Sequence, residues 1–137
     1  MKSYYQHLKS AQEFGETINT TRKPILRSSG VFPAIHNQYY SSSLHFVGYW
    51  LIKGNTPETL LVTLRNADGK TLLKKTRIID VAKAFSIDLS SLLLEIGFDT
   101  KKNFLGSIET EFHSTKDMFY PYPAVTLEYH NEEFNTC

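Results

Sequence analysis

Cysteine is almost absent from this chain: among its 137 residues only the last, Cys137, is a cysteine. No intrachain disulfide can form, which excludes the small secreted scaffolds that depend on disulfide bonds. The stretch from Met1 to His7 also lacks the apolar segment of a secretory signal peptide. We therefore expect a cytoplasmic protein.

A strong charge of one sign and a long apolar run are missing as well. The formal net charge is +1, and the lysines and arginines are scattered apart from a small group at Lys70, Lys74, Lys75 and Arg77. That group is typical of the solvent face of a strand, and no phosphate-binding stripe is present. No window approaches the roughly 18 apolar residues that a membrane span needs. We expect neither nucleic acid nor a membrane as a partner.

Sequence motifs of the common enzymes are also missing. The chain has no Gly-x-Gly-x-x-Gly, no complete phosphate-binding Gly-x-x-x-x-Gly-Lys-Ser/Thr, no His-Glu-x-x-His and no Cys-x-x-Cys, which sets aside nucleotide-dependent and zinc-finger functions. Ser41, Ser42 and Ser43 are not framed by a Gly-x-Ser-x-Gly elbow, so we interpret them as a linker into a strand. The sequence favours a protein that is not an enzyme.

What is present indicates one domain over residues 1–137. Apolar residues in the first 15 positions approximate a helical stripe and predict a short N-terminal helix over residues 1–15. Pro24, Gly30 and Pro33 interrupt residues 16–43, which we interpret as a wrapping segment with one edge strand near Ile25–Arg27. The body of the domain is expected over residues 44–131.

The body has the pattern of an all-β protein. Strand-like runs with short turns and no long helices between them predict an antiparallel β-sandwich, of which a jelly roll is one form. Asp68-Gly69 lies between two such runs and predicts a hairpin. Trp50 is expected in the core. The predicted strands are Leu44–Ile52, Thr59–Arg65, Lys70–Ile79, Ala82–Leu89, Phe104–Ser114 and Ala124–Tyr129.

The order of elements from His45 through Asn131 resembles that of small bacterial β-sandwich proteins of the sensory-rhodopsin-transducer type. The shared features are a strand, a hairpin, an apolar strand near Val81–Leu89, and a strand that leads into a polar and aromatic stretch. The resemblance implies a soluble oligomer with an exposed interaction surface and a likeness to carbohydrate-binding sandwiches. It assigns no individual binding residue.

Two groups of residues are candidates for a functional site. Glu109, Glu111 and His113 alternate along one predicted strand face and could bind a divalent metal if His45 or His130 lay nearby. The simpler interpretation of that group is a solvated strand face.

The second candidate is the stretch from Met118 to Pro123, in which two prolines stiffen a run of aromatics. Tyr120 and Tyr122 could contact a carbohydrate or a protein partner, with Tyr39 and Tyr40 on the same surface. The simpler alternative is that Phe119 and one tyrosine plug the end of the sandwich.

Three functions follow from these candidates. The first is a non-catalytic binding module for a carbohydrate or a protein partner. The second is a small metal-dependent enzyme or metal-binding protein. The third is a structural subunit of a homo-oligomer.

Overall fold

The computed structural model describes Lys9 and residues 23–131. The expected helix over residues 1–15 lies outside the described residues except for Lys9. Over residues 23–131 two short helices, α2 (Tyr49–Gly54) and α3 (Leu89–Glu95), accompany the strands. The strands of the described part are β1 (Arg27–His36), β2 (Tyr40–Val47), β3 (Glu58–Asn66), β4 (Thr71–Ile79), β5 (Ala84–Asp88), β6 (Phe104–His113) and β7 (Val125–Asn131).

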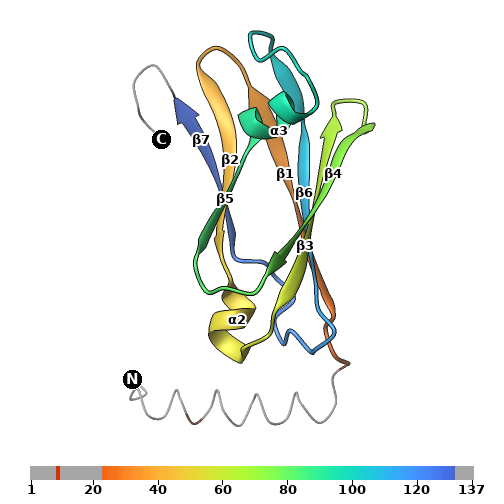
Figure 1. The fold of residues 1–137 in the computed structure, drawn as a ribbon, viewed down its shortest axis with the longest axis vertical. Helices are drawn as coiled ribbons and strands as arrows, with labels where there is room; N and C mark the ends of the chain where they lie inside the picture. Colours follow the sequence, from red (N-terminus) through yellow and green to blue (C-terminus); the bar gives the residue numbers. More distant parts are fainter. Residues whose placement is uncertain (1–8, 10–22, 132–137) are drawn as a thin grey trace.

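The strands form two antiparallel layers (Figure 1). One layer has the order β4-β3-β6-β1, and in the other β2 pairs with β5 and with β7. The layers are joined at the β1–β2 hairpin, where the register holds a single pair, His36 and Ser41. This arrangement confirms the predicted all-β fold and antiparallel sandwich. In the described part of the chain no helix has the length and apolar character needed to cross a membrane.

Aromatic rings fill the space between the layers. Phe46 of β2 stacks on Phe85 of β5 at a centroid distance of 5.2 Å, and it meets the edge of Phe112 of β6 at 5.4 Å. Trp50 lies 5.2 Å from Phe112 and is buried, which confirms its predicted place in the core. Offset and edge-on ring contacts of this kind stabilise a core beyond the area that they bury.

The hairpin between β3 and β4 forms where Asp68-Gly69 predicts it. Gly69 has a φ of 81°, which a residue without a Cβ adopts without strain. The side-chain oxygen of Asn66 accepts hydrogen bonds from the backbone N–H groups of Asp68 and Lys70 at 3.1 and 2.9 Å. The turn therefore has its own polar support, and it fixes the register of the two strands.

The structure differs from the prediction over the segment 27–43. Instead of a short edge strand near Ile25–Arg27, β1 runs from Arg27 to His36 and pairs with β6 along its whole length. Pro33 lies within this strand although it has no N–H to donate, and β1 has a long ladder on one side only, with β6, because its pairing with β2 is a single residue pair. The three serines expected to form a linker lie within β2.

The predicted strand 44–52 also ends early. β2 stops at Val47, and α2 follows from Tyr49 to Gly54. The helix ends at Asn55, whose left-handed backbone (φ 49°) lets its N–H donate to the carbonyl of Leu51. Trp50 thus enters the core from a helix rather than from a strand.

Candidate functional site

The segment that connects β6 to β7, residues 114–124, lies at the α2 end of the sandwich (Figure 1). It is held against the chain just before β1, because Met118 N–H donates to the carbonyl of Ile25 at 2.8 Å. One carboxylate oxygen of Asp117 accepts from the N–H groups of Ile25 and Phe119, each at 3.0 Å. The hydroxyl of Ser28 donates to the carbonyl of Pro121. Hydrogen bonds to Ile25, just before β1, and to Ser28, within β1, therefore hold this connection in place.

Phe119 has an unusual backbone. Its φ is 68°, and the N–H of Tyr120 donates to the carbonyl of Met118 at 2.7 Å, which forms the rare γ-turn with positive φ. A left-handed conformation costs a residue with a Cβ roughly 1–2 kcal/mol. Such strain persists only when surrounding contacts impose it, and it gathers at binding and active sites. The turn places the rings of Phe119 and Tyr120 side by side, with centroids 6.4 Å apart.

The stretch from Met118 to Pro123 contains one buried side chain and three exposed aromatic rings. Met118 is buried and anchors the connection in the core. Phe119 and Tyr120 are each about half exposed, and Tyr122 is 81% exposed. Tyr120 is held by Tyr49, whose ring it meets edge-on at 5.6 Å. The alternative in which Phe119 and one tyrosine plug the sandwich does not describe this arrangement, because Met118 and Trp50 fill the interior.

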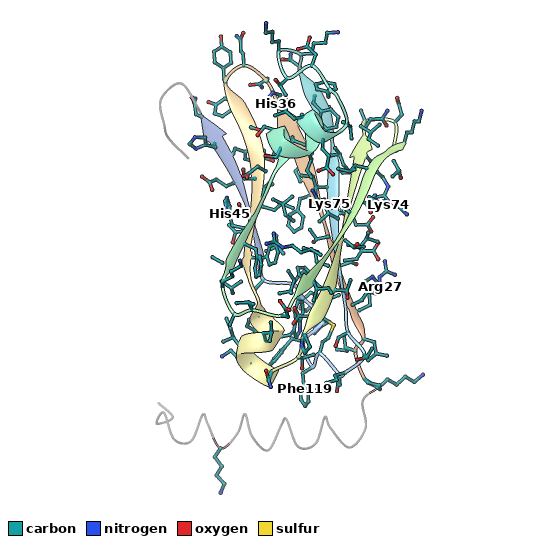
Figure 2. The ribbon with its side chains drawn as sticks, in the orientation of Figure 1. Arg27, His36, His45, Lys74, Lys75 and Phe119 are labelled. Carbon is teal, nitrogen blue, oxygen red and sulfur yellow. The ribbon has the colours of Figure 1, made fainter. Side chains whose placement is uncertain are left out.

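Phe119 and Tyr120 border a concave site, here called the end pocket, of about 430 Å³, whereas Tyr122, predicted to act with Tyr120, is not among its lining residues. Its volume lies in the range typical of small-ligand sites. The indole N–H of Trp50 donates to the carbonyl of Tyr120 at 3.2 Å, so the wall of the pocket is tied to the γ-turn. Figure 2 shows Phe119 at this end of the molecule. The lining residues are Trp50, Lys53, Gly54, Thr56, Asp117, Phe119 and Tyr120.

The end pocket combines two kinds of chemistry. Phe119 and Tyr120 offer apolar ring surface, Lys53 offers N–H donors, and Asp117 adds a carboxylate that also holds the backbone of Ile25 and Phe119. A sugar ring presents the complementary groups, with C–H groups on its faces and hydroxyl groups around its edge. The arrangement is suited to binding a small ligand with apolar faces and polar edges.

Tyr39 and Tyr40 do not share this surface. They lie in the β1–β2 hairpin, where both backbone N–H groups donate to the side chain of Asn37 at 2.8 Å. The hairpin follows the end of β1 at His36, whereas the aromatic connection contacts the other end of β1 at Ser28. At about 3.3 Å per residue these ends are roughly 26 Å apart. The prediction of one common surface is therefore wrong, because β1 separates its two halves.

Glu109, Glu111 and His113 lie on the outer face of β6, as their alternation predicts. Each carboxylate contacts an arginine on a neighbouring strand: Glu109 contacts Arg65 and Glu111 contacts Arg27, both at 2.6 Å. The Nε2 atom of His113 lies 3.4 Å from the same carboxylate of Glu111. Guanidinium groups thus lie where a bound cation would have been expected. Within the described residues no group of three or more potential ligands converges to hold a metal ion.

His45 and His130 do not approach that group. They lie on β2 and β7 in the other layer, so the prediction that either would join Glu109 and Glu111 is wrong. Instead they belong to a polar surface of that layer, lined by Ser41, Ser43, His45, Asp88, Ser90, Glu128 and His130. Sequence reasoning missed this surface, although Ser-x-Ser-x-His in β2 and Glu-x-His in β7 alternate in the same way.

Two contacts organise the polar surface. Nε2 of His45 lies 2.6 Å from a carboxylate oxygen of Glu128 on β7. The hydroxyl of Ser43 donates to Asp88 on β5 at 2.9 Å. Glu128 and Asp88 therefore each contact a side chain of β2, the central strand of this layer. These contacts are cross-strand side-chain pairs.

Known proteins give no guide to the role of these sites. The chain matches no protein-family model, no curated protein and no solved structure. The resemblance to sandwiches of the sensory-rhodopsin-transducer type stays a prediction, and a function has to be argued from the geometry of this chain.

Proposed function

We propose that this protein is a non-catalytic binding module whose end pocket holds a carbohydrate. The observation that carries the proposal is the strained γ-turn at Phe119, which presents two half-exposed rings beside a concave, partly polar site. Its cytoplasmic setting is part of the proposal and is in keeping with a chain that has a single cysteine.

Preorganisation supports this assignment. The rings are carried by a backbone that Asp117, Ile25 and Trp50 fix through hydrogen bonds, so little conformational entropy is lost when a ligand stacks on them. Aromatic side chains are themselves rigid and combine an apolar face with, in tyrosine, a polar tip. Lys53 and Asp117 would then select ligands by the positions of their hydroxyl groups.

Trp50 provides a direct test, because it is the only tryptophan of the chain and lines the end pocket. We expect titration with a panel of mono- and oligosaccharides to change its fluorescence for one class of sugar. Replacing Tyr120 by alanine should weaken that binding at least tenfold, which corresponds to about 1.4 kcal/mol. Trp50 stays in place in this variant, so the same signal reports on both proteins.

Tyr39→Ala is the matched control. Tyr39 and Tyr120 are both 48% exposed, but Tyr39 lies at the opposite end of the sandwich. Its removal should leave affinity unchanged. Equal affinity of the Tyr120→Ala variant and the unmodified protein would remove the end pocket as the site. If no sugar of the panel changed the fluorescence, a protein partner or a structural subunit would be favoured instead. Light scattering would separate these two, because a structural subunit should be an oligomer at every concentration measured.

A further inference from the structure

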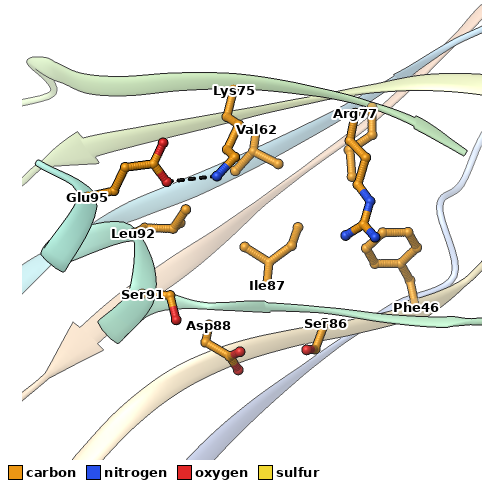
Figure 3. Close-up of a pocket in the computed structure, with 11 residues that line it drawn as sticks. Phe46, Val62, Lys75, Arg77, Ser86, Ile87, Asp88, Ser91, Leu92 and Glu95 are labelled. Carbon is orange, nitrogen blue, oxygen red and sulfur yellow. Dashed lines mark hydrogen bonds and ion pairs between the residues drawn. The ribbon is translucent and has the colours of Figure 1, made fainter.

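A second concave surface lies between the two layers, on the side where β4 and β5 are the outermost strands (Figure 3). This inter-sheet groove has a volume of about 180 Å³. Its apolar lining comes from both layers and from α3. The apolar residues are Phe46, Leu60, Val62, Ile87 and Leu92. The end pocket shares no residue with it.

Two cations of β4 point toward this apolar lining. Lys75 pairs in register with Val62 and Arg77 with Leu60, so both share the inward face of their layer. Inward-pointing charges on an edge strand prevent edge-to-edge association, but they also place positive charge at the mouth of the groove. Lys75 is neutralised, since its Nζ atom lies 2.8 Å from Glu95 of α3. Figure 3 shows this ion pair at one end of the groove and Arg77 at the other.

The end occupied by Arg77 keeps its positive charge. The guanidinium carbon lies 4.7 Å from the ring centroid of Phe85, and Nζ of Lys83 lies 5.3 Å from the same centroid. Within the described residues neither cation forms an ion pair with a carboxylate. Asp88 also lines the groove, but it accepts the hydroxyl of Ser43 and lies on the β5 side, away from Arg77 (Figure 3). A guanidinium on an aromatic face retains N–H donors for an anion.

We propose that the inter-sheet groove binds a small anionic amphiphile: a carboxylate held at Arg77 and Lys83, with an apolar body of roughly six to eight carbons between the layers. The size of the ligand's apolar part follows from the volume of the groove, because a cavity of about 150 Å³ already holds benzene. The negative charge of the ligand follows from the positive charge of the groove at the end away from the Lys75–Glu95 pair. This site is independent of the proposed function, since its ligand and its lining residues are different.

Straight-chain carboxylates from butanoate to decanoate are the probes, measured by calorimetry on the full chain. We expect affinity to rise roughly fourfold per added methylene, as apolar burial requires, and to level off once the chain outgrows the groove. Hexanol, which has the same chain without the charge, should bind roughly tenfold more weakly than hexanoate. Equal affinity for hexanol and hexanoate would overturn the proposal of an anion site.

Arg77→Gln should weaken hexanoate roughly tenfold and leave hexanol unchanged. Lys74→Gln is the matched control, because Lys74 lies on the same strand, is exposed and pairs in register with Thr63 rather than with the groove residues. It removes the same charge, so an equal loss in both variants would show a general effect of net charge and refute the assignment to Arg77.

The position of the ligand can be read by NMR even if a variant is unstable. Methyl signals of Val62, Ile87 and Leu92 should shift on addition of hexanoate, while Trp50 fluorescence stays constant. Shifts confined to other methyl groups would place the ligand elsewhere and overturn the proposal. A change in Trp50 fluorescence with sugars but not with hexanoate would show that the two sites are separate.

Discussion

Glu58, the first residue of β3, gives the sharpest prediction about the stability of this protein. Its side chain is buried, with the residue only 2% exposed, and it pairs in register with the fully buried Ile79. Among the described residues neither carboxylate oxygen has a hydrogen-bond partner. Burial therefore penalises the ionised form and raises the pKa of Glu58 from 4.5 to about 7.

The sign of the effect follows from the raised pKa. The folded state retains the proton of Glu58 at a pH where the unfolded chain has lost it, so the stabilising contribution of this group is fully present below pH 4.5 and is lost as the pH rises toward and through 7. One pKa unit corresponds to about 1.4 kcal/mol. Between pH 5 and pH 8 this single group should lower the free energy of unfolding by about 2–3 kcal/mol.

Replacing Glu58 by glutamine removes the titration and keeps the shape of the side chain. Between pH 5 and pH 8 the free energy of unfolding of the Glu58→Gln variant should fall by about 2–3 kcal/mol less than that of the unmodified protein. Urea unfolding followed by the fluorescence of Trp50 measures both proteins. Asp68→Asn is the control, since it removes one negative charge from an exposed turn. Identical pH dependence in the unmodified protein and in Glu58→Gln would refute the reasoning.

Two further predictions concern the backbone. Phe119→Gly should be more stable than Phe119→Ala by about 1 kcal/mol in thermal unfolding, the reverse of the usual order, because only glycine adopts a φ of 68° without strain; equal stabilities would argue against an imposed left-handed turn. Gly106→Ala should cost at least about 2 kcal/mol, since a Cβ there would lie 2.0 Å from the carbonyl oxygen of Arg65. Gly54→Ala, where the nearest atom is 3.5 Å away, should change the midpoint little, and a similar loss in both variants would contradict the steric explanation.

The sequence was sufficient for features that depend on neighbouring residues. Alternation of apolar and polar side chains predicts β6, and Asp68-Gly69 predicts the hairpin between β3 and β4, because both signals are local. β1 was not recognised over its full length, because Gly30 and Pro33 read as breaks in a single sequence. They become compatible with a strand only once β1 is known to have a long ladder on one side only.

The sites depend on strand order, which local patterns do not contain. Glu109 and Glu111 are on one face as predicted, but their arginine partners come from β3 and β1. Tyr39 and Tyr120 are at opposite ends for the same reason. The inter-sheet groove was likewise beyond sequence reasoning, because Arg77 reads as the solvent face of a strand until the register with β3 turns it inward.

The pairing of β1 with β6 also governs the order in which the chain can fold. β1 precedes β2 in the chain, yet its ladder runs from Arg27 opposite His113 to His36 opposite Phe104. During synthesis β1 and β3 must therefore wait for β6, which lies between them, while the β3–β4 hairpin can close at once. Pairings between distant segments fold slowly and leave strand edges open to aggregation. We expect the layer of β4, β3, β6 and β1, and with it the core, to form only once β6 has been synthesised and has paired with both β1 and β3.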